Sequence, residues 1–321
     1  MKPIKRPAHR GWLAPLLLVA LPSFVSPGPA LALEEVIVSY AGPTVTFLPA
    51  EVARQRGFMR EQNLDVKLLL TRSEVDRAAL VSGSVDYTLR AGSSFVSAAR
   101  GLPVRIVLVG TMRPFWGLVV RPEVKSVTEL KGKSMGVPGL LGSQQVSAKF
   151  ILKHYGLDPD KDIVYRIVDS GTRIAAMSSG AIDCAMMDYG EAFRAKKAGF
   201  KFLVNAADLH GLLAGGLAVN SKKLSEQPDQ VRRMLKAMTQ ALKFIQDDPE
   251  GTQRVMMSWL KLDREKAADI YQMAKNNYTK NGMVEESMLN PLVTAMLAEA
   301  GVKSVSPSQL VDFSLLQQAL K

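Results

Sequence analysis

Apolar runs alternate with segments of helical spacing along the first two thirds of the chain. Predicted strands include Glu35–Tyr40, Leu64–Leu70 and Val104–Val109, and the segments Leu48–Arg56 and Glu74–Ser82 are predicted helices. The second strand is apolar enough to be covered on both faces. Strands that alternate with helices of about ten residues indicate βαβ units and a parallel sheet. The pattern therefore predicts an α/β fold.

One pattern occurs twice. Leu80–Tyr87 and Met177–Cys184 both contain the end of a helix, a Ser-Gly pair and a short apolar strand that carries an aspartate. Glycine ends a helix readily because it adopts the left-handed conformation without a Cβ clash. The two copies lie about 97 positions apart, and similar segments flank both in the same order. We interpret them as two similar α/β lobes.

Two segments interrupt the alternation of strands and helices. Thr111–Trp116 is irregular and leads into the strand Gly117–Val120, which Gly215–Asn220 mirrors. We interpret these as the two crossings between lobes. The predicted division is residues 1–32 as a signal peptide, residues 33–112 plus 214–321 as the first lobe and residues 113–213 as the second lobe.

The last hundred residues have helical patterns throughout. We expect these helices to pack on the first lobe, with the methionines at helical spacing in its core. The expected helices are Pro228–Asp247, Pro249–Leu260, Arg264–Asn276, Glu285–Ala300 and Pro307–Leu320.

The first 32 residues resemble a secretory signal. Four basic residues precede an apolar run from Trp12 to Val25, and Ala30-Leu31-Ala32 fits an A-x-A cleavage site. The run is short for a transmembrane anchor, and Pro15 and Pro22 interrupt it. We therefore expect export through a cleavable signal, with a mature chain that starts at Leu33.

Composition supports an exported globular protein. The chain has 321 residues, 47% of them hydrophobic and 22% charged, which excludes a disordered chain. The formal net charge is +11, and removing the four basic residues of the signal leaves +7. We expect no nucleic-acid partner, because basic and aromatic residues are not interleaved. The only cysteine, Cys184, is expected to be a buried apolar residue.

The predicted site is a cleft where the loops at the carboxyl ends of the strands of both lobes meet. Ligands bind at this edge of open parallel sheets. Four loops contribute, and they contain Gly42–Phe47, Arg90–Ser94, Gly139–Gln144 and Asp188–Glu191. The candidate ligand-binding residues are Thr44, Thr46, Phe47, Arg90, Ser93, Ser94, Arg113, Trp116, Gly142, Ser143, Gln144 and Asp188.

Several of these residues have a second interpretation. Ser143 suits a helix N-cap as well as a ligand contact, and Thr44 suits a turn. Trp116 is explained equally by packing at the crossing. Arg90 and Arg113 could each bind a carboxylate or sulfonate with two hydrogen bonds. Asp188 adds negative charge, which favours a zwitterionic or cation-bearing ligand over a simple anion.

Catalytic and metal-binding motifs are missing from the sequence. The three histidines, His9, His154 and His210, do not cluster with the single cysteine in sequence, and no nucleotide-binding or nucleophile motif occurs. We therefore expect no cofactor, no metal and no enzymatic activity.

Three groups of residues carry a family resemblance. Ala79–Tyr87 with Gly101–Val104, Val119–Pro122 with Ser126–Lys133, and Tyr155–Asp162 resemble the periplasmic substrate-binding proteins of ABC transporters. The resemblance is to the nitrate/sulfonate/taurine/bicarbonate group, also described as thiamine-precursor-synthesis-like, and it covers roughly residues 36–220. The loop that begins at Asp188 departs from the group, many of whose members have a neutral loop with a proline.

The resemblance implies a type II periplasmic-binding-protein fold. It further implies a monomer that captures a small organic or anionic solute and delivers it to an inner-membrane permease with its ATPase. Family ligand contacts would come from the loop after the first strand, the turn before Ser93-Ser94 and the Gly142-Ser143 loop. The alternative is an enzyme on the same fold that acts on a pyrimidine-like or anionic metabolite, although the histidine- and cysteine-rich motifs of such enzymes are absent. A transcription-regulator domain would need a DNA-binding module in the place of the signal.

Overall fold

The computed structural model describes residue 3 and residues 32–140, 142–211, 213–285, 294, 297–298, 301–302, 305–306 and 309–321. Leu33–Lys321 form one compact unit. The predicted signal peptide lies outside the described residues, apart from Pro3 and Ala32, and stays a prediction. The predicted lobe boundaries likewise stay a prediction, because the compact unit is not divided further.

The first of two five-stranded sheets has the strand order β2-β1-β3-β10-β4. Its first three strands are parallel, since β1 pairs with both β2 and β3 in that direction. The strand bounds are β1 (Glu34–Tyr40), β2 (Leu64–Leu70), β3 (Tyr87–Thr88), β4 (Val104–Val109) and β10 (Gly216–Asn220).

The second sheet repeats this arrangement with the order β7-β6-β8-β5-β9. Val38 of the first sheet pairs with Leu68 and Tyr87, and Met135 of the second pairs with Tyr165 and Cys184. Each position in the second set is the first-set number plus 97, so the spacing predicted from sequence is also the structural offset. The bounds are β5 (Trp116–Val120), β6 (Lys133–Val137), β7 (Ile163–Ile167), β8 (Cys184–Asp188) and β9 (Lys201–Asn205).

Each sheet combines the parallel βαβ strands that the sequence predicted with one antiparallel strand, so both sheets are mixed. β10 runs antiparallel between β3 and β4, and β5 runs antiparallel between β8 and β9. Both strands carry a register shift, at Leu217/Ala218 and at Leu118/Val119. Each of these two strands follows directly on a crossing and not on a helix of a βαβ unit. It therefore enters its sheet in the direction opposite to the βαβ strands.

Two matched details confirm the repeat. Gly83 and Gly180 follow helices with φ of 79° and 80°, the left-handed conformation that favours glycine. The carboxylates of Asp86 and Asp183 accept the amides of Ile37 and Ser134, each at 2.8 Å. These aspartates therefore hold neighbouring strands together in both sheets.

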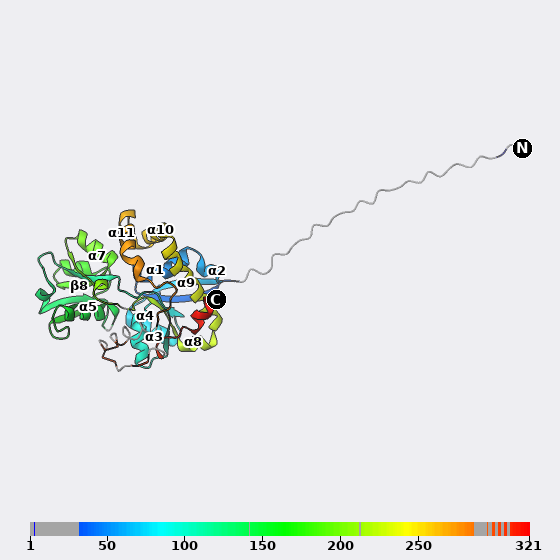
Figure 1. The fold of residues 1–321 in the computed structure, drawn as a ribbon, viewed down its shortest axis with the longest axis horizontal. Coiled ribbons are helices and arrows are strands. Elements are labelled where there is room, and N and C mark those ends of the chain that lie inside the picture. Colours follow the sequence, from blue (N-terminus) through cyan, green and yellow to red (C-terminus); the bar gives the residue numbers. More distant parts are fainter. Residues whose placement is uncertain are drawn as a thin grey trace. The chain divides into compact units, whose positions relative to one another are not determined.

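Helices cover both sheets. Those of the repeats are α1 (Leu48–Gln55), α2 (Phe58–Glu61), α3 (Ser73–Ser82), α4 (Ala91–Ala99), α5 (Ser143–His154), α6 (Arg173–Ser178) and α7 (Tyr189–Lys197). The C-terminal helices are α8 (Ser221–Glu226), α9 (Pro228–Asp247), α10 (Pro249–Leu260), α11 (Arg264–Ala274) and α13 (Ser314–Ala319). In Figure 1 the second-sheet elements α5, β8 and α7 lie on one side of the unit, and α1, α2 and α9 lie on the other.

The C-terminal helices pack on the first sheet as predicted. Residues of α9, α10 and α11 share one buried apolar cluster with β1 and α1. Met234 and Met256 of this cluster are fully buried, which confirms core packing for the methionine-rich faces. Cys184 is buried and free, and burial raises the pKa of its thiol.

Two predicted C-terminal helices differ from the structure or lie outside it. The helix expected at Glu285–Ala300 falls largely outside the described residues. The helix expected at Pro307–Leu320 begins only at Ser314. The preceding segment pairs with the edge strand β4, where the amide of Ile106 donates to the carbonyl of Leu310 at 3.0 Å and Val311 forms a parallel bridge.

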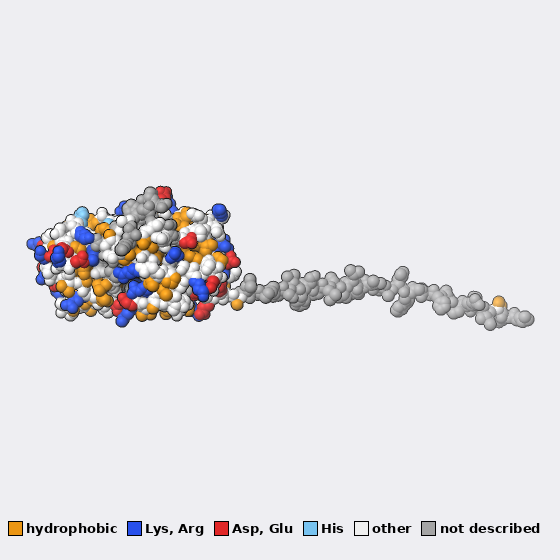
Figure 2. Space-filling view, turned by 90° about the horizontal axis from the view of Figure 1, so that it is seen from below, with side chains coloured by type: hydrophobic (Ala, Val, Ile, Leu, Met, Phe, Trp, Pro, Cys, Tyr) orange, Lys and Arg blue, Asp and Glu red, His pale blue; other side chains and the backbone are white. Residues whose placement is uncertain are grey.

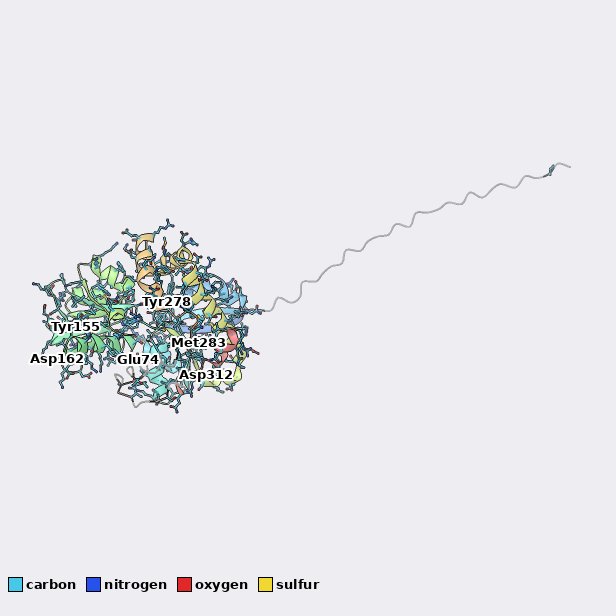
Figure 3. All side chains as sticks on the ribbon, in the orientation of Figure 1. Glu74, Tyr155, Asp162, Tyr278, Met283 and Asp312 are labelled. Carbon is cyan, nitrogen blue, oxygen red and sulfur yellow. The ribbon has the colours of Figure 1, made fainter. Side chains whose placement is uncertain are left out.

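A third segment supports the two crossings. Tyr278 packs against Phe115 with ring centroids 4.9 Å apart, and its hydroxyl donates to the carbonyl of Val45 at 2.6 Å. Figure 3 shows Tyr278 between the elements of the two sheets. The crossings also bond to each other, because the hydroxyl of Thr111 accepts the amide of Gly215 at 2.9 Å.

Within the described residues, no helix is long and apolar enough to span a membrane. On the face shown in Figure 2, basic and acidic side chains are interspersed with apolar ones. The surplus of basic residues therefore forms no single patch on that face.

Candidate functional site

A cavity of about 620 Å³ lies between the loops of the two sheets. This volume is within the range of small-molecule sites. The first sheet supplies the loop after β1, the end of β2 and Arg90, and the second sheet supplies Pro138, the loop after β7 and the start of α7. A third wall comes from the end of α10, and the lining residues there are Trp259, Leu260 and Lys261.

A recess of about 90 Å³ adjoins this cavity and shares Ala41, Thr44, Arg90, Pro138 and Ser170 with it. The predicted site residues lie mainly here. The recess is lined by Thr44, Thr46, Phe47, Arg90, Ser93, Trp116, Gly142, Ser143 and Gln144, and Asp188 lines the larger cavity. The structure therefore brings ten of the twelve predicted residues to one connected space.

The other two predicted residues lie elsewhere. Ser94 is buried in α4, where its hydroxyl donates to the carbonyl of Arg90 at 3.0 Å. Arg113 lines neither cavity, because its Nη1 donates to the carbonyl of Ala207 at 3.1 Å. Neither residue lines the two spaces described above, and a ligand contact by either stays a prediction.

The helices α4 and α5, which follow strands of different sheets, come close together at the recess. A Cβ on Gly92, in the first turn of α4, would lie 2.1 Å from the Oγ of Ser143. The N-cap of α5 is Gly142 and no side chain caps this helix, so the capping role considered for Ser143 is wrong. Glycine suits position 92 because a Cβ there would also lie 2.7 Å from the backbone carbonyl oxygen of Leu213, which cannot rotate away.

A buried acid organises the first-sheet wall. Oδ1 of Asp76 accepts the hydroxyls of Ser39 at 2.5 Å and of Thr88 at 2.8 Å. The guanidinium of Arg90 lies 3.9 Å from the same oxygen and donates to the carbonyl of Thr71. Arg90 therefore directs its charge to its own lobe, although it lines the cavity.

A buried arginine organises the second-sheet wall. Arg173 is fully buried and lies 3.1 Å from the carboxylate of Glu191, which is also fully buried. Its Nη1 donates to Oε1 of Gln144 at 2.8 Å, and its Nη2 donates to the hydroxyl of Ser170. Gln144 therefore serves to position Arg173. Three of the loops around the cavity are tied to this one guanidinium.

Two acids at the start of α7 have perturbed pKa values. Asp188 is the N-cap and accepts the amide of Glu191 at 2.9 Å. Burial raises the pKa of Asp188, and burial raises the pKa of Glu191 to about 7 despite the opposing effect of Arg173. A buried carboxylate that lines a cavity is costly unless a partner offsets its charge.

One residue that lines the recess has a buried donor without a partner. Nε1 of Trp116 has no hydrogen-bond partner among the described residues, and the side chain is 3% exposed. A buried, unpaired indole N–H is unusual in a folded protein. A ligand acceptor in the recess would satisfy it.

The sequence interpretation missed several cavity residues. Arg72 and Asp169 line the cavity from opposite sheets and form an exposed ion pair at 3.3 Å. Arg72 follows β2 and Asp169 follows β7, and these two strands occupy equivalent positions in the repeat. A comparison of the two copies could therefore have identified both loops. Arg194 and the end of α10 had no such signal, because only the packing of the helices brings them to the cavity.

The described residues contain no group of three or more His, Cys, Asp or Glu side chains that could hold a metal ion. His210 bonds the buried hydroxyl of Ser147 at 2.7 Å and stacks on Phe150. No described residue that lines either space is a histidine or a cysteine. The polar groups of the site are therefore guanidinium, ammonium, hydroxyl, carboxylate, amide and indole groups.

Comparisons with known proteins agree with this geometry. Residues 44–252 match the NMT1/THI5-like family. The 4-amino-5-hydroxymethyl-2-methylpyrimidine phosphate synthases of Saccharomyces cerevisiae are 30% identical over 233 residues, covering 64% of this chain and 65% of theirs. The match thus spans slightly less than two thirds of the length of these curated relatives.

Solved structures share the fold. The ligand-binding component of an ABC-type import system from Staphylococcus aureus, with zinc bound, superposes with a TM-score of 0.76 at 14% identity, covering 89% of this chain and 99% of that one. The periplasmic nitrate-binding protein from Synechocystis has a TM-score of 0.72 at 14% identity, covering 89% and 88%. The fold is therefore the periplasmic-binding-protein fold that the sequence predicted.

Proposed function

Because the chain belongs to the NMT1/THI5-like family, and its two sheets enclose a polar cavity, we propose that it is a solute-binding protein. The solute would be a small organic or anionic molecule held in the cleft between two lobes. The lobes would comprise residues 33–112 plus 214–321 and residues 113–213, which contain the first and second sheets respectively.

One observation carries this proposal. Loops from both sheets line the same cavity of about 620 Å³, so a bound solute would contact both lobes at once. A ligand that contacts both lobes favours the conformation in which they meet. The unpaired indole of Trp116 and the hydroxyls of Thr44, Ser93 and Ser143 are the proposed ligand contacts in the recess.

We further propose that the protein works in the periplasm as a monomer and delivers its solute to an ABC permease with its ATPase. Two observations support this. The name of the Staphylococcus aureus neighbour describes a component of such an import system, and the Synechocystis neighbour is named as periplasmic. The predicted signal peptide at residues 1–32 is consistent with export.

An enzyme on this fold is the second candidate. The observation that favours it is the name of the yeast relatives, which are pyrimidine phosphate synthases. Against it, the described lining residues offer neither a histidine base nor a cysteine nucleophile. Turnover of an amino-pyrimidine by the purified protein would favour the enzyme.

Native mass spectrometry of protein purified without stripping tests the binding function. We expect one small molecule per chain, released unchanged when the protein is unfolded in acid. Release of a chemically converted molecule after incubation would favour the enzyme. A chain without bound mass, which also fails to bind any solute after refolding, would contradict the proposal.

A further inference from the structure

We propose that a small cavity outside the cleft, between α7 and α11, binds a small aromatic carboxylate such as benzoate. The cavity has a volume of about 130 Å³ and is lined by Tyr189, Ala192, Phe193, Lys196, Phe202 and Met273. None of these residues lines the cleft cavity or its recess. This second site goes beyond the proposed solute site, and either can fail without the other.

The helix α7 has one face toward each space. Gly190 and Arg194 of this helix line the cleft cavity. The small cavity is lined by the residues at i, i+3, i+4 and i+7 counted from Tyr189, which is the spacing of a single helix face. The two spaces therefore lie on different faces of α7.

The wall of the small cavity is aromatic and comes from both proposed lobes. Tyr189 and Phe202 pack edge to face with ring centroids 6.3 Å apart. Met273 lies on α11, a neighbour of α7 in Figure 1, and is 40% exposed. Methionine sulfur makes favourable contacts with aromatic rings. An apolar cavity of about 150 Å³ is large enough to bind benzene, so one ring would fill this space and leave its substituent at the open side.

The first lobe covers the equivalent surface with its own chain. Helices α4 and α7 begin at Ala91 and Tyr189, 98 residues apart (189 minus 91), so Phe95 is equivalent to Phe193. Phe95 is fully buried in a cluster that includes Leu310 of the C-terminal segment. Phe193 is only half-buried and lines the cavity. A bound ring would therefore give Phe193 the apolar cover that Phe95 receives from the chain.

A lysine at the rim defines the polar end of the ligand. Lys196 is exposed, and its ammonium has no hydrogen-bond or ion-pair partner among the described residues. A lysine in such a position covers apolar surface with its stem and keeps its ammonium in water. At the adjoining junction, contact with Lys266 of α11 lowers the pKa of Lys197, while Asp263 and Glu265 offset part of this positive charge. Lys196 is therefore the ammonium available to a carboxylate.

Three probes separate the ring from the charge on the stripped and refolded protein. Benzoate has both, benzamide has the ring without the charge, and acetate has the carboxylate without the ring. In ligand-observed NMR titrations we expect benzoate to bind about two- to fivefold more tightly than benzamide, as for one exposed ion pair. It should bind at least about tenfold more tightly than acetate, which buries no ring. Equal affinities of benzoate and benzamide, or no binding of benzoate at about 10 mM, would overturn the proposal.

Substitutions at exposed positions assign the binding to this cavity. Met273→Glu places a carboxylate on the wall and should weaken benzoate by at least about threefold, whereas Met273→Lys should bind benzoate at least as tightly as wild type. Lys196→Gln should reduce the preference for benzoate over benzamide to about onefold, and the exposed control Lys236→Gln on α9 should not. Unchanged affinity in Met273→Glu and Lys196→Gln would contradict the assignment.

A cleft variant distinguishes this cavity from the solute site. Ser143→Trp would fill the recess of the cleft and should leave the affinity for benzoate unchanged. Loss of benzoate binding in Ser143→Trp, together with no effect of Met273→Glu, would place the aromatic acid in the cleft and overturn the proposal. Neither result changes whether the unstripped protein releases a solute, which tests the proposed function separately.

Discussion

The two lobes solve the same structural problem with opposite charges. Asp76 and Arg173 lie 97 residues apart. The same offset relates the paired residues of β1, β2 and β3 to those of β6, β7 and β8. Both are buried near the start of the helix after the second strand, and both hold the loop after the third strand. Asp76 faces Arg90, whereas Arg173 pairs with Glu191.

The residues that surround Asp76 differ from those that surround Arg173. Ser39 and Thr88 donate hydroxyls to Asp76, and the equivalent positions of the second lobe hold Gly136 and Ala185. A Cβ on Gly136 would lie 3.6 Å from Cγ of Arg173 and 2.6 Å from Ile182. The small residues leave room for the long arginine side chain. The two lobes therefore differ both in the charge of the buried residue and in the size of its neighbours.

The comparison indicates that each lobe uses one buried charged residue, which we call its anchor, to hold the loops around the cavity. The anchor is an acid in one lobe and a base in the other. A buried charge is tolerated only when partners satisfy it. The anchor of the first lobe has two hydroxyls in direct contact and its guanidinium only at 3.9 Å, whereas the anchor of the second depends on an ion pair at 3.1 Å whose two members are fully buried. Mutations should therefore be more damaging in the second lobe.

Arg173→Met should have the largest effect. It leaves Glu191 buried without its cation and frees Gln144, and we expect a loss of about 3–5 kcal/mol in the free energy of unfolding. Urea denaturation measures this loss. The double variant Arg173→Met/Glu191→Gln should recover much of it, and a double variant as unstable as the single one would argue against the ion pair as the cause.

Asp76→Ala should cost less, about 2–3 kcal/mol, because the hydroxyls of Ser39 and Thr88 lose a strong acceptor but leave no buried charge unpaired except that of Arg90. Asp76→Asn, which keeps an acceptor, is the matched control and should cost about half as much. A loss larger than that of Arg173→Met in the same denaturation experiment would reverse the comparison.

Stability should depend on pH through Glu191 of the second lobe. The pKa of Glu191 is raised from 4.5 to about 7, so the folded protein binds a proton that the unfolded chain has released between these values. Stability should therefore fall as pH rises from 4.5 to 7, by about 2 kcal/mol relative to the Glu191→Gln variant. Parallel profiles of the two proteins, measured by denaturation at each pH, would contradict this pKa.

Gly136→Ser would give the second lobe the serine that the first lobe has at the equivalent position, Ser39. It should crowd Ile182 and Arg173 and cost about 1 kcal/mol, since the contacted Ile182 atom is the end of a flexible side chain. Thermal denaturation measures the change. Combining the substitution with Arg173→Met should lower its cost, and an additive result would show that the arginine does not need the space.

Arg72→Asp should have the smallest effect. Arg72 and Asp169 are also 97 residues apart and meet across the cleft, but their side chains are 78% and 53% exposed. Exposed pairs contribute about 1 kcal/mol or less. Reversal of the pair in Arg72→Asp/Asp169→Arg should restore stability at low salt, and a double variant weaker than the single one would exclude a direct interaction.

Local patterns predicted most of the fold. The strands β2 and β4 and the helices α9 and α10 have the predicted bounds, because their apolar periodicity and their proline and glycine signals are local. The segment before Ser314 was wrongly predicted to be helical. It pairs instead with Ile106, in a strand about two hundred residues earlier in the chain. Sequence pattern does not encode that contact.

The candidate site was predictable in its loops but less so in its roles. Parallel topology places the carboxyl ends of the strands at one edge of each sheet. Thr44 after β1, and Ser143 and Asp188 at the ends of β6 and β8, could therefore be found from their position. The orientation of Gln144 toward Arg173 and of Arg113 toward Ala207 depends on burial and tertiary partners. The wall formed by Trp259 depends on how the C-terminal helices pack.

The central claim is that a solute binds between the two sheets, and a thermal-shift screen of stripped, refolded protein tests it most directly. The panel holds nitrate, bicarbonate, taurine, alkyl sulfonates and amino-pyrimidines, each with wild type, Ser143→Trp and the exposed control Ser178→Trp. At about a hundred times its dissociation constant, a solute adds about 2.7 kcal/mol to the stability of the native state.

We predict that at least one solute raises the melting temperature of wild type and of Ser178→Trp by a few degrees and leaves Ser143→Trp unchanged. The tryptophan at position 143 would fill the recess and collide with Gly92. An equal shift in all three proteins would place the binding site outside this cleft and contradict the account.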